Sequence, residues 1–243
     1  MRPLIICSTY NECENIAPLA KEILSNAPEA NVLVVDDNSP DGTGQIVRDL
    51  IKTEPRVHLL ARPGKLGLGT AILDGMQWGL DRGYDPICTM DADFSHHPRY
   101  LPAILAGSQK YDVMIGSRYI PGGGTKNWGI SRQILSRTSN LVSRILLGFP
   151  TKDCTGCYRA YRADLLKKID RKSIKSSGYS FVEEVLELCY RAKASMGETP
   201  IIFEDRRAGS SKISRKEVYK AVLTLFRLRW QRITGAGKQQ KTA

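Results

Sequence analysis

Short, nearly continuous apolar runs alternate in the first hundred residues with longer segments whose apolar positions recur every three or four residues. The short runs predict strands that are buried on both faces, and the longer segments predict amphipathic helices. Strands are expected at Pro3–Ser8, Asn31–Val35, Val57–Leu60 and Tyr84–Met90. Helices are expected at 15–26 and 43–52, and a third opens after the stretch 62–69. Repeated strand–helix units of this length predict right-handed crossovers and a parallel, Rossmann-like sheet.

The pattern is less regular in the second half of the chain. Further strands are expected at Tyr111–Gly116, Asp153–Arg162 and Pro200–Asp205, and helices at Ser131–Leu147, Phe181–Ala192 and Ser214–Ile233. A flexible glycine-rich loop is expected at 121–124. The fold class is therefore α/β, with a mostly parallel central sheet flanked by helices in a single domain. Residues 213–234 are predicted to form a basic amphipathic helix, and 235–243 a disordered tail.

Positive charge is concentrated in two segments. The net charge is +11; residues 205–243 hold 11 basic and 2 acidic side chains, and residues 118–152 hold 6 basic and no acidic ones. This indicates an anionic partner: a membrane surface, a phosphate-bearing substrate or a nucleic acid. The helix at 131–147, whose charged residues are all arginines, suits a membrane surface, but a core-facing helix with a solvated basic side fits equally well. The last helix is likewise expected to pack on the body or to lie on lipid headgroups.

Other features of the composition narrow the class of protein. No segment reaches the roughly 18 to 20 consecutive apolar residues of a spanning helix, and the first apolar run is too short for a signal peptide. Of six cysteines, only Cys154 and Cys157 have a suggestive spacing, and one such pair is weak evidence for zinc or redox chemistry. We expect reduced thiols and an intracellular protein.

Two carboxylates, Asp91 and Asp93, follow the fourth predicted strand. Ligands of open α/β sheets collect beyond the carboxyl ends of the strands. Two acids one residue apart can reach a single hard cation whose shell is completed by phosphate oxygens. Taken alone, the pattern is equally typical of a turn that caps a strand. Upstream, Lys65 lies among Gly64, Gly67 and Gly69, which suits an anion cradle at a helix start or simply a tight turn.

Several segments in fixed order carry a resemblance to a known family. They are Ser8–Glu12, Asp36–Thr43, Arg62–Gly69, Met90–Pro98, Gly116–Tyr119, Trp128–Ser136, Asp153–Arg159 and Arg206–Lys212. The chain resembles the inverting family 2 glycosyltransferases of GT-A fold, and among them the dolichyl-phosphate mannosyltransferases, also called polyprenol monophosphomannose synthases. The resemblance implies one GT-A domain over 1–212, with a nucleotide-sugar half at 1–98 and an acceptor half at 99–212.

The resemblance also implies roles for individual residues. The donor nucleotide would contact Ser8, Tyr10, Glu12, Val35, Asp37, Lys65, Asp91 and Ala92. Mg²⁺ or Mn²⁺ would bind Asp91, Asp93 and Ser95, although many relatives have Gln where Ser95 stands. The acceptor phosphate would bind Arg118, Arg132, Ser136, Arg206 and Lys212. The catalytic set would be Asp91, Asp93, Arg118 and Arg132. His96 and His97 are expected to shape the loop rather than to ligate metal, and Glu183 and Glu184 to be charges at a helix start.

The implied reaction is inverting transfer of mannose from GDP-mannose to a polyprenyl phosphate at the cytoplasmic face of a membrane. An acceptor phosphate is already anionic near neutral pH and needs no strong general base. The chain would be a peripheral membrane protein that binds no nucleic acid, and the need for a separate membrane subunit stays open. Three alternatives remain: a related transferase that uses UDP-glucose or another sugar nucleotide, a basic nucleic-acid-binding protein, and an inactive membrane adaptor.

Overall fold

The computed structural model describes residues 1–176, 178, 180–205 and 215–234. Nine strands lie within these residues: β1 (Leu4–Thr9), β2 (Asn31–Asp36), β3 (Val57–Ala61), β4 (Ile87–Asp91), β5 (Val113–Ser117), β6 (Gly124–Lys126), β7 (Arg159–Tyr161), β8 (Met196–Pro200) and β9 (Ile202–Glu204). The α-helices described are α1 (Ile16–Asn26), α2 (Thr43–Ile51), α3 (Leu68–Asp81), α4 (Leu101–Gly107), α5 (Ile130–Leu147), α6 (Ala163–Lys168), α7 (Phe181–Arg191) and α8 (Arg215–Thr234). Short 3₁₀ turns occupy Pro98–Tyr100 and Arg171–Ser173.

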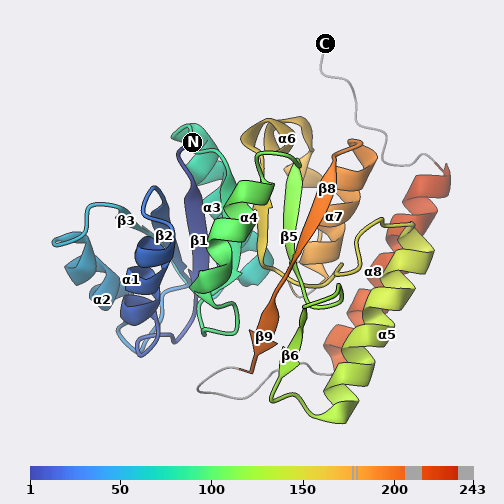
Figure 1. Cartoon of the computed structure of the whole chain (residues 1–243), viewed down its shortest axis with the longest axis horizontal. Coiled ribbons are helices and arrows are strands. Elements are labelled where there is room, and N and C mark those ends of the chain that lie inside the picture. The colour runs from blue at the N-terminus through green and yellow to red at the C-terminus, as the bar shows by residue number, and fades with distance from the viewer. Residues whose placement is uncertain (177, 179, 206–214, 235–243) are drawn as a thin grey trace.

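The central sheet has seven strands in the order β3-β2-β1-β4-β7-β5-β8. All neighbouring pairs are parallel except those of β7, which runs antiparallel to both β4 and β5. Strands β6 and β9 form a separate two-stranded parallel sheet near the carboxyl ends of the central strands (Figure 1). This arrangement confirms the predicted α/β fold with a mostly parallel central sheet.

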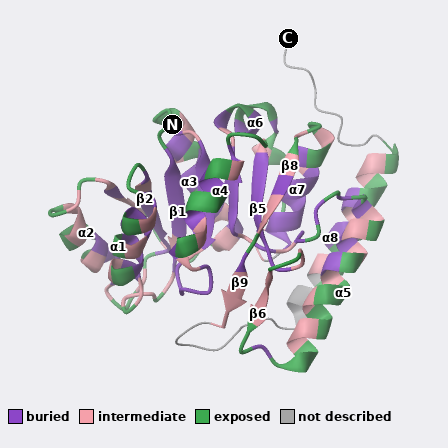
Figure 2. Ribbon diagram, in the orientation of Figure 1, coloured by how far each residue is buried: buried purple, intermediate pink, exposed green. Residues whose placement is uncertain are grey.

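Two apolar cores hold the helices against opposite faces of this sheet. One core joins side chains of α1, α2 and α4 to β1 and β2, including Leu19, Val47 and Ile104. The other joins α3, α6 and α7 to the same strands, including Met76 and Leu186. Figure 2 shows the central strands buried between these layers. Strands covered on both faces need apolar residues at consecutive positions, which is why β1 and β2 are readable from sequence.

The second half departs from expectation in four places. Helices α4 and α6 were not predicted, and both are short, with seven and six residues, so neither spans enough turns to show a helical repeat. The strand expected at 153–162 is confined to β7, the strand expected at 200–205 corresponds to β9, and the preceding strand β8 was not predicted. The loop at 121–124 is closely packed: a Cβ on Gly123 would lie 2.4 Å from the carbonyl oxygen of Ser117. Glycine is needed there for close approach of backbones.

Helices α5 and α8 lie side by side at the β8 end of the molecule (Figure 1). Three glutamates of α7 attach them to the body. Glu183 contacts Ser143 of α5, Glu184 accepts a hydrogen bond from Arg227 of α8 at 2.8 Å, and Glu187 pairs with Arg232 of α8. The last helix thus packs on the body, as one prediction allowed, while the tail at 235–243 lies outside the described residues.

Both helices also expose apolar side chains, and each set forms a stripe on one side of its helix. On α5 the exposed set is Ile130, Ile134, Leu135, Leu141 and Ile145, and on α8 it is Tyr219, Val222, Leu223, Phe226, Trp230 and Ile233. Polar residues of α5 face inward instead, since Asn140 and Ser143 are buried. Apolar side chains therefore lie on both sides of these helices, since Leu147 of α5 and Leu225 and Leu228 of α8 are buried in the core. No helix in the described ranges is long and apolar enough to cross a bilayer.

Candidate active site at the carboxyl edge of the sheet

The predicted site residues collect where β1, β2 and β4 end. In the strand register Ser8 of β1 lies beside Val35 of β2 on one side and Asp91 of β4 on the other. The residues predicted to bind the nucleotide and those predicted to bind the metal therefore lie at the same edge of the sheet. The loops that leave these strands hold non-glycine residues with positive φ, namely Asn11, Asn38 and Phe94 at 64°, 56° and 62°. Such a conformation is costly for an aromatic residue and clusters at functional sites.

The loops after β1 and β2 are fixed to each other by hydrogen bonds. Asp36 is buried and accepts from the Thr9 hydroxyl at 2.9 Å and from the Ser39 hydroxyl at 2.5 Å. Ser39 in turn accepts from the backbone N–H of Asn11 at 3.0 Å. Beside this network the Ser8 hydroxyl is buried without a hydrogen-bond partner among the described residues. A buried hydroxyl of this kind is suited to a ligand.

Asp37 organises the loop that was predicted to cradle an anion. Its carboxylate accepts from Arg62 at 2.5 Å and from the backbone N–H groups of Leu66 and Gly67 at 3.0 and 2.9 Å. The adjoining Lys65 Nζ lies 3.8 Å from the centre of the Tyr10 ring. Asp37 thereby places Lys65 over the aromatic residue that follows β1. A cation and an aromatic face are brought together where a base and its phosphates would lie.

The acid pair is held by the loop that follows β4. Asp93 is buried and accepts from both the backbone N–H and the hydroxyl of Ser95, at 3.1 and 2.5 Å, whereas the Asp91 side chain is 31% exposed. The buried side chain of His96 accepts from the Asp91 backbone N–H at 3.0 Å. No group of three or more His, Cys, Asp or Glu side chains that could hold a metal occurs among the described residues. Two carboxylates that leave most positions to phosphate and water are a donor set that fits Mg²⁺ or Mn²⁺.

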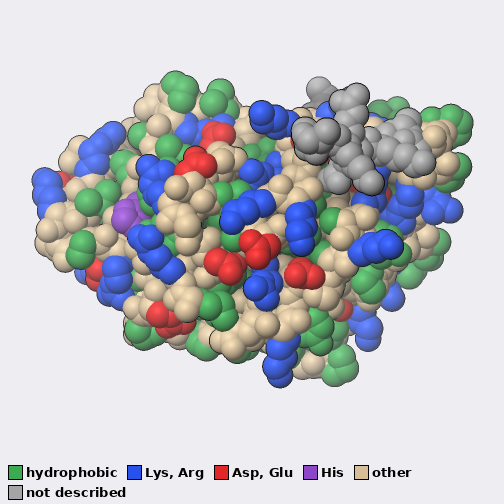
Figure 3. Space-filling model, turned by 90° about the horizontal axis from the view of Figure 1, so that it is seen from above, with side chains coloured by type: hydrophobic (Ala, Val, Ile, Leu, Met, Phe, Trp, Pro, Cys, Tyr) green, Lys and Arg blue, Asp and Glu red, His purple; other side chains and the backbone are tan. Residues whose placement is uncertain are grey.

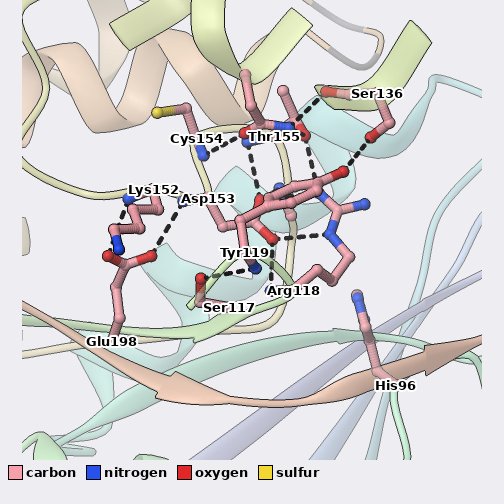
Figure 4. Close-up of polar contacts among 12 residues, drawn as sticks. His96, Ser117, Arg118, Tyr119, Ser136, Lys152, Asp153, Cys154, Thr155 and Glu198 are labelled. Atoms are coloured by element: carbon pink, nitrogen blue, oxygen red, sulfur yellow. Dashed lines mark hydrogen bonds and ion pairs between the residues drawn. The ribbon is translucent and has the colours of Figure 1, made fainter. Parts of the chain in front are cut away.

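Arg118 follows β5 and is oriented by a buried carboxylate. Its Nε and Nη2 atoms donate to Asp153 at 2.7 Å each, and Nη2 also donates to Thr155 at 2.8 Å (Figure 4). Burial alone would raise the pKa of Asp153, but the Arg118 guanidinium outweighs it and holds this pKa at about 2. The pair is therefore ionised, and Nη1 is the nitrogen of Arg118 that the described residues leave for a phosphate. The sequence assigned no role to Asp153.

Arg132 and Ser136 reach the same region from the first turns of α5. Arg132 donates to Asp205 at 2.9 Å, and its guanidinium carbon lies 4.0 Å from the centre of the Trp128 ring. Ser136 is 2.7 Å from the Tyr119 hydroxyl, next to Arg118 in the chain (Figure 4). Three of the five predicted acceptor residues are thus brought together. The other two, Arg206 and Lys212, lie outside the described residues.

The opposite edge of the sheet has a different character. Figure 3 views that side of the molecule, where acidic and basic side chains are interspersed.

Elsewhere in the molecule, several basic side chains of the two positively charged segments form ion pairs with carboxylates. The pairs are Arg118 with Asp153, Arg132 with Asp205, Arg227 with Glu184 and Arg232 with Glu187. The localised charge of these segments is therefore partly neutralised within the fold.

Residues 4–170 match the family described as Glycosyl transferase family 2. This match covers more than half of the chain. The chain belongs to glycosyltransferase family 2. It is 43% identical over 235 residues to an undecaprenyl-phosphate mannosyltransferase of Micrococcus luteus, with 95% of this chain and 97% of that protein covered. It is 44% identical over 226 residues to a polyprenol monophosphomannose synthase of Mycolicibacterium smegmatis, with 91% of this chain and 84% of that protein covered.

Solved structures agree with the fold. Glucosyl-3-phosphoglycerate synthase from Mycobacterium tuberculosis, in complex with Mn²⁺, UDP and glucosyl-3-phosphoglycerate, superposes with a TM-score of 0.68 at 14% identity over 94% of this chain and 80% of that one. TarS of S. aureus in complex with UDP-GlcNAc gives a TM-score of 0.61 at 17% identity over 94% and 66%. The glycosyltransferase is therefore an enzyme of GT-A fold, as its sequence motifs predicted.

Proposed function

We propose that this glycosyltransferase transfers mannose from GDP-mannose to a polyprenyl phosphate, with inversion at the sugar, on the cytoplasmic face of a membrane. Both curated relatives are named for mannose and a polyprenyl phosphate, and each aligns over most of its own length. The observation that carries the proposal is the pair of oriented guanidiniums, Arg118 and Arg132, on the far side of the acid pair from the nucleotide loops. A phosphate acceptor requires such cations, and a neutral hydroxyl acceptor does not.

The donor would occupy the loops that follow β1, β2 and β3. Tyr10 offers a ring face to the base, and Ser8 offers its unpaired hydroxyl. Lys65 would move from the Tyr10 ring toward the base or the phosphates. Asp37 accepts three hydrogen bonds in the loop and keeps lone pairs for the nucleotide. The remaining proposed contacts are Glu12, Val35, Asp91 and Ala92.

Asp91, Asp93 and Ser95 would hold the metal against the donor diphosphate. A bound Mg²⁺ or Mn²⁺ supplies positive charge that stabilises the departing nucleoside diphosphate. Ser95 already fixes Asp93 by hydrogen bonds, so the Asp93 carboxylate is oriented before any ligand arrives. Arg118 and Arg132 orient the attacking phosphate oxygen toward the sugar, with Ser136, Arg206 and Lys212 proposed as further contacts. Because the acceptor is anionic, this step needs no residue to remove a proton.

The exposed stripes of α5 and α8 would lie on the membrane surface. Ile130 is 77% exposed and Trp230 is 68% exposed, and both belong to stripes made of large apolar residues. Such side chains partition into the interface between headgroups and acyl chains. The first turns of α5 carry this stripe on one side and Arg132 and Ser136 on the other. A lipid phosphate at the surface would therefore lie close to the acceptor arginines.

The test is transfer from radiolabelled GDP-mannose to a polyprenyl phosphate in detergent or vesicles. We expect labelled lipid from the wild type and a loss of at least about a hundredfold from Asp93→Ala, since the diphosphate loses its metal. Asp164→Ala, in an exposed carboxylate of α6, is the matched control. Equal labelling by the wild type and Asp93→Ala would refute the metal assignment. Labelling from UDP-glucose in place of GDP-mannose would refute the donor.

A further inference from the structure

His96 is buried beside the acid pair and has no part in the transfer step described above. Its Nδ1 atom accepts a hydrogen bond from the backbone N–H of Asp91 at 3.0 Å. A ring nitrogen that accepts cannot carry a proton, so the single proton of the neutral ring is on Nε2. The same Nδ1 lies 3.5 Å from the Asp91 carboxylate. Because Nδ1 carries no proton, it cannot donate to that carboxylate, and the imidazole holds Asp91 through the backbone N–H alone.

The ring of His96 is itself held by aromatic neighbours. It stacks on Tyr158 with ring centres 4.9 Å apart and meets the edge of Phe203 at 5.2 Å. The Phe203 ring also contacts Trp128 at 5.2 Å. The rings of His96, Phe203 and Trp128 thus form a row. The row runs from the loop after β4 toward Arg118 and Arg132. In Figure 4 the His96 side chain projects toward Arg118.

The acceptor arginines rest on the other end of this row. The Arg118 guanidinium carbon lies 5.7 Å from the centre of Phe203 and 5.8 Å from that of Trp128, and that of Arg132 lies 4.0 Å from Trp128. Cations at such distances are attracted to an aromatic face. The row therefore touches a metal ligand at one end and both phosphate-binding cations at the other.

We propose that His96 is a positioning residue with two separable contacts. Its Nδ1 fixes the backbone of Asp91, and with it the position of the carboxylate offered to the divalent cation, and its ring supports the aromatic row beneath Arg118 and Arg132. Groups that hydrogen-bond around metal ligands typically change metal affinity or activity by about 10- to 100-fold when removed. This inference rests on the proposed function, because it takes Asp91 as a metal ligand and Arg118 and Arg132 as acceptor contacts.

Two substitutions separate the contacts. His96→Phe keeps a ring but removes the acceptor for the Asp91 N–H. His96→Asn removes the ring but places an amide oxygen near the position of Nδ1. Mn²⁺ binding is measured by calorimetry with GDP or UDP present and no acceptor, so that no turnover occurs. The KM for polyprenyl phosphate is measured separately at saturating Mn²⁺, and thermal unfolding of each variant is recorded.

We expect His96→Phe to weaken Mn²⁺ binding about tenfold or more while the KM for the lipid stays near that of the wild type. We expect His96→Asn to bind Mn²⁺ within about threefold of the wild type and to raise the lipid KM, because an amide oxygen keeps the hydrogen bond while the ring is lost. Wild-type affinity for Mn²⁺ in His96→Phe would overturn the inference alone. So would equal losses in both variants that track a lowered melting temperature. Wild-type protein that binds no Mn²⁺ with either nucleotide would overturn the metal assignment itself.

Discussion

Glu183 of α7 is expected to make the stability of the enzyme depend on pH in a way that one substitution removes. The side chain is buried between α7 and α5 in contact with the Ser143 hydroxyl. Burial raises the pKa of Glu183 from 4.5 to about 7, against the lowering effects of Ser143 and Arg159. When ionised, the Glu183 carboxylate accepts from the Ser143 hydroxyl. When protonated, it can instead donate to Ser143, whose own proton then goes to the Ser139 carbonyl 2.9 Å away.

The direction and size of the effect follow from linkage. Folding raises this pKa, so the folded protein binds the proton more tightly than the unfolded chain. The resulting stability is fully present below about pH 4.5 and is lost as the pH rises through about 7. The interval of about 2.5 pH units, at about 1.36 kcal/mol per unit, gives a loss of about 3 kcal/mol. That is a large part of the total stability of an ordinary domain.

Glu183→Gln tests this reasoning, because glutamine has the shape of the protonated acid and can donate to Ser143 but does not titrate. The free energy of unfolding is measured by urea denaturation of both proteins from about pH 5 to about pH 8. We expect the wild type to lose about 2.5 kcal/mol relative to the variant across this range, since part of the loss lies below pH 5. Glu29→Gln, an exposed carboxylate in the turn before β2, is the control. Parallel curves for the wild type and Glu183→Gln would refute the buried, protonated carboxyl.

Three further outcomes are expected. Asp153→Asn should lower the free energy of unfolding by about 3 kcal/mol and raise the KM for polyprenyl phosphate, because it leaves the buried Arg118 without its counter-charge. An unchanged KM in steady-state assays would refute the proposal that Asp153 orients Arg118. Trp230→Ser should weaken binding to anionic vesicles in sedimentation about thirtyfold while the melting temperature stays constant, since about 2 kcal/mol of apolar transfer is lost from an exposed position. Lys65→Ala should weaken GDP binding in calorimetry about tenfold, through lost contact with the base or phosphates, whereas Tyr10→Phe, which keeps the ring, should not.

The first half of the fold was predictable because its strands are buried on both faces and its helices are amphipathic. Continuous apolar runs and a repeat of 3.6 residues can both be recognised in the sequence without knowledge of the tertiary structure. In the second half, β7 has three residues and β8 has the sequence Met-Gly-Glu-Thr-Pro, so neither carries a hydrophobic period. Their pairing with β5 is fixed by contacts distant in sequence. Such strands cannot be recognised from local pattern.

The same limit applies to the site. The position of Asp91 and Asp93 at the carboxyl edge of the sheet was predictable, because they directly follow an apolar strand. Asp153 was not, because it is 35 residues from Arg118 in the chain and only the antiparallel β7 brings the two together. Phe203 is a comparable case, since its contact with His96 depends on the β6–β9 sheet. A sequence motif indicates which residues matter, whereas the partner that orients each one depends on topology.

The exposed apolar stripes of α5 and α8 explain why the sequence alone allowed two interpretations of these helices, packing on the body or lying on a membrane surface. A period of 3.6 residues shows that apolar side chains share one side of a helix, but not whether that side faces the core. Here several charged and polar side chains face inward, next to buried leucines: Arg227 and Arg232 contact glutamates of α7, and Ser143 contacts Glu183. Because these polar groups form their hydrogen bonds and ion pairs inside the protein, the solvent-facing side of each helix can carry apolar residues. A membrane surface would cover that side, and the phosphate of a lipid at the surface would then meet the arginine that α5 presents on its inner side.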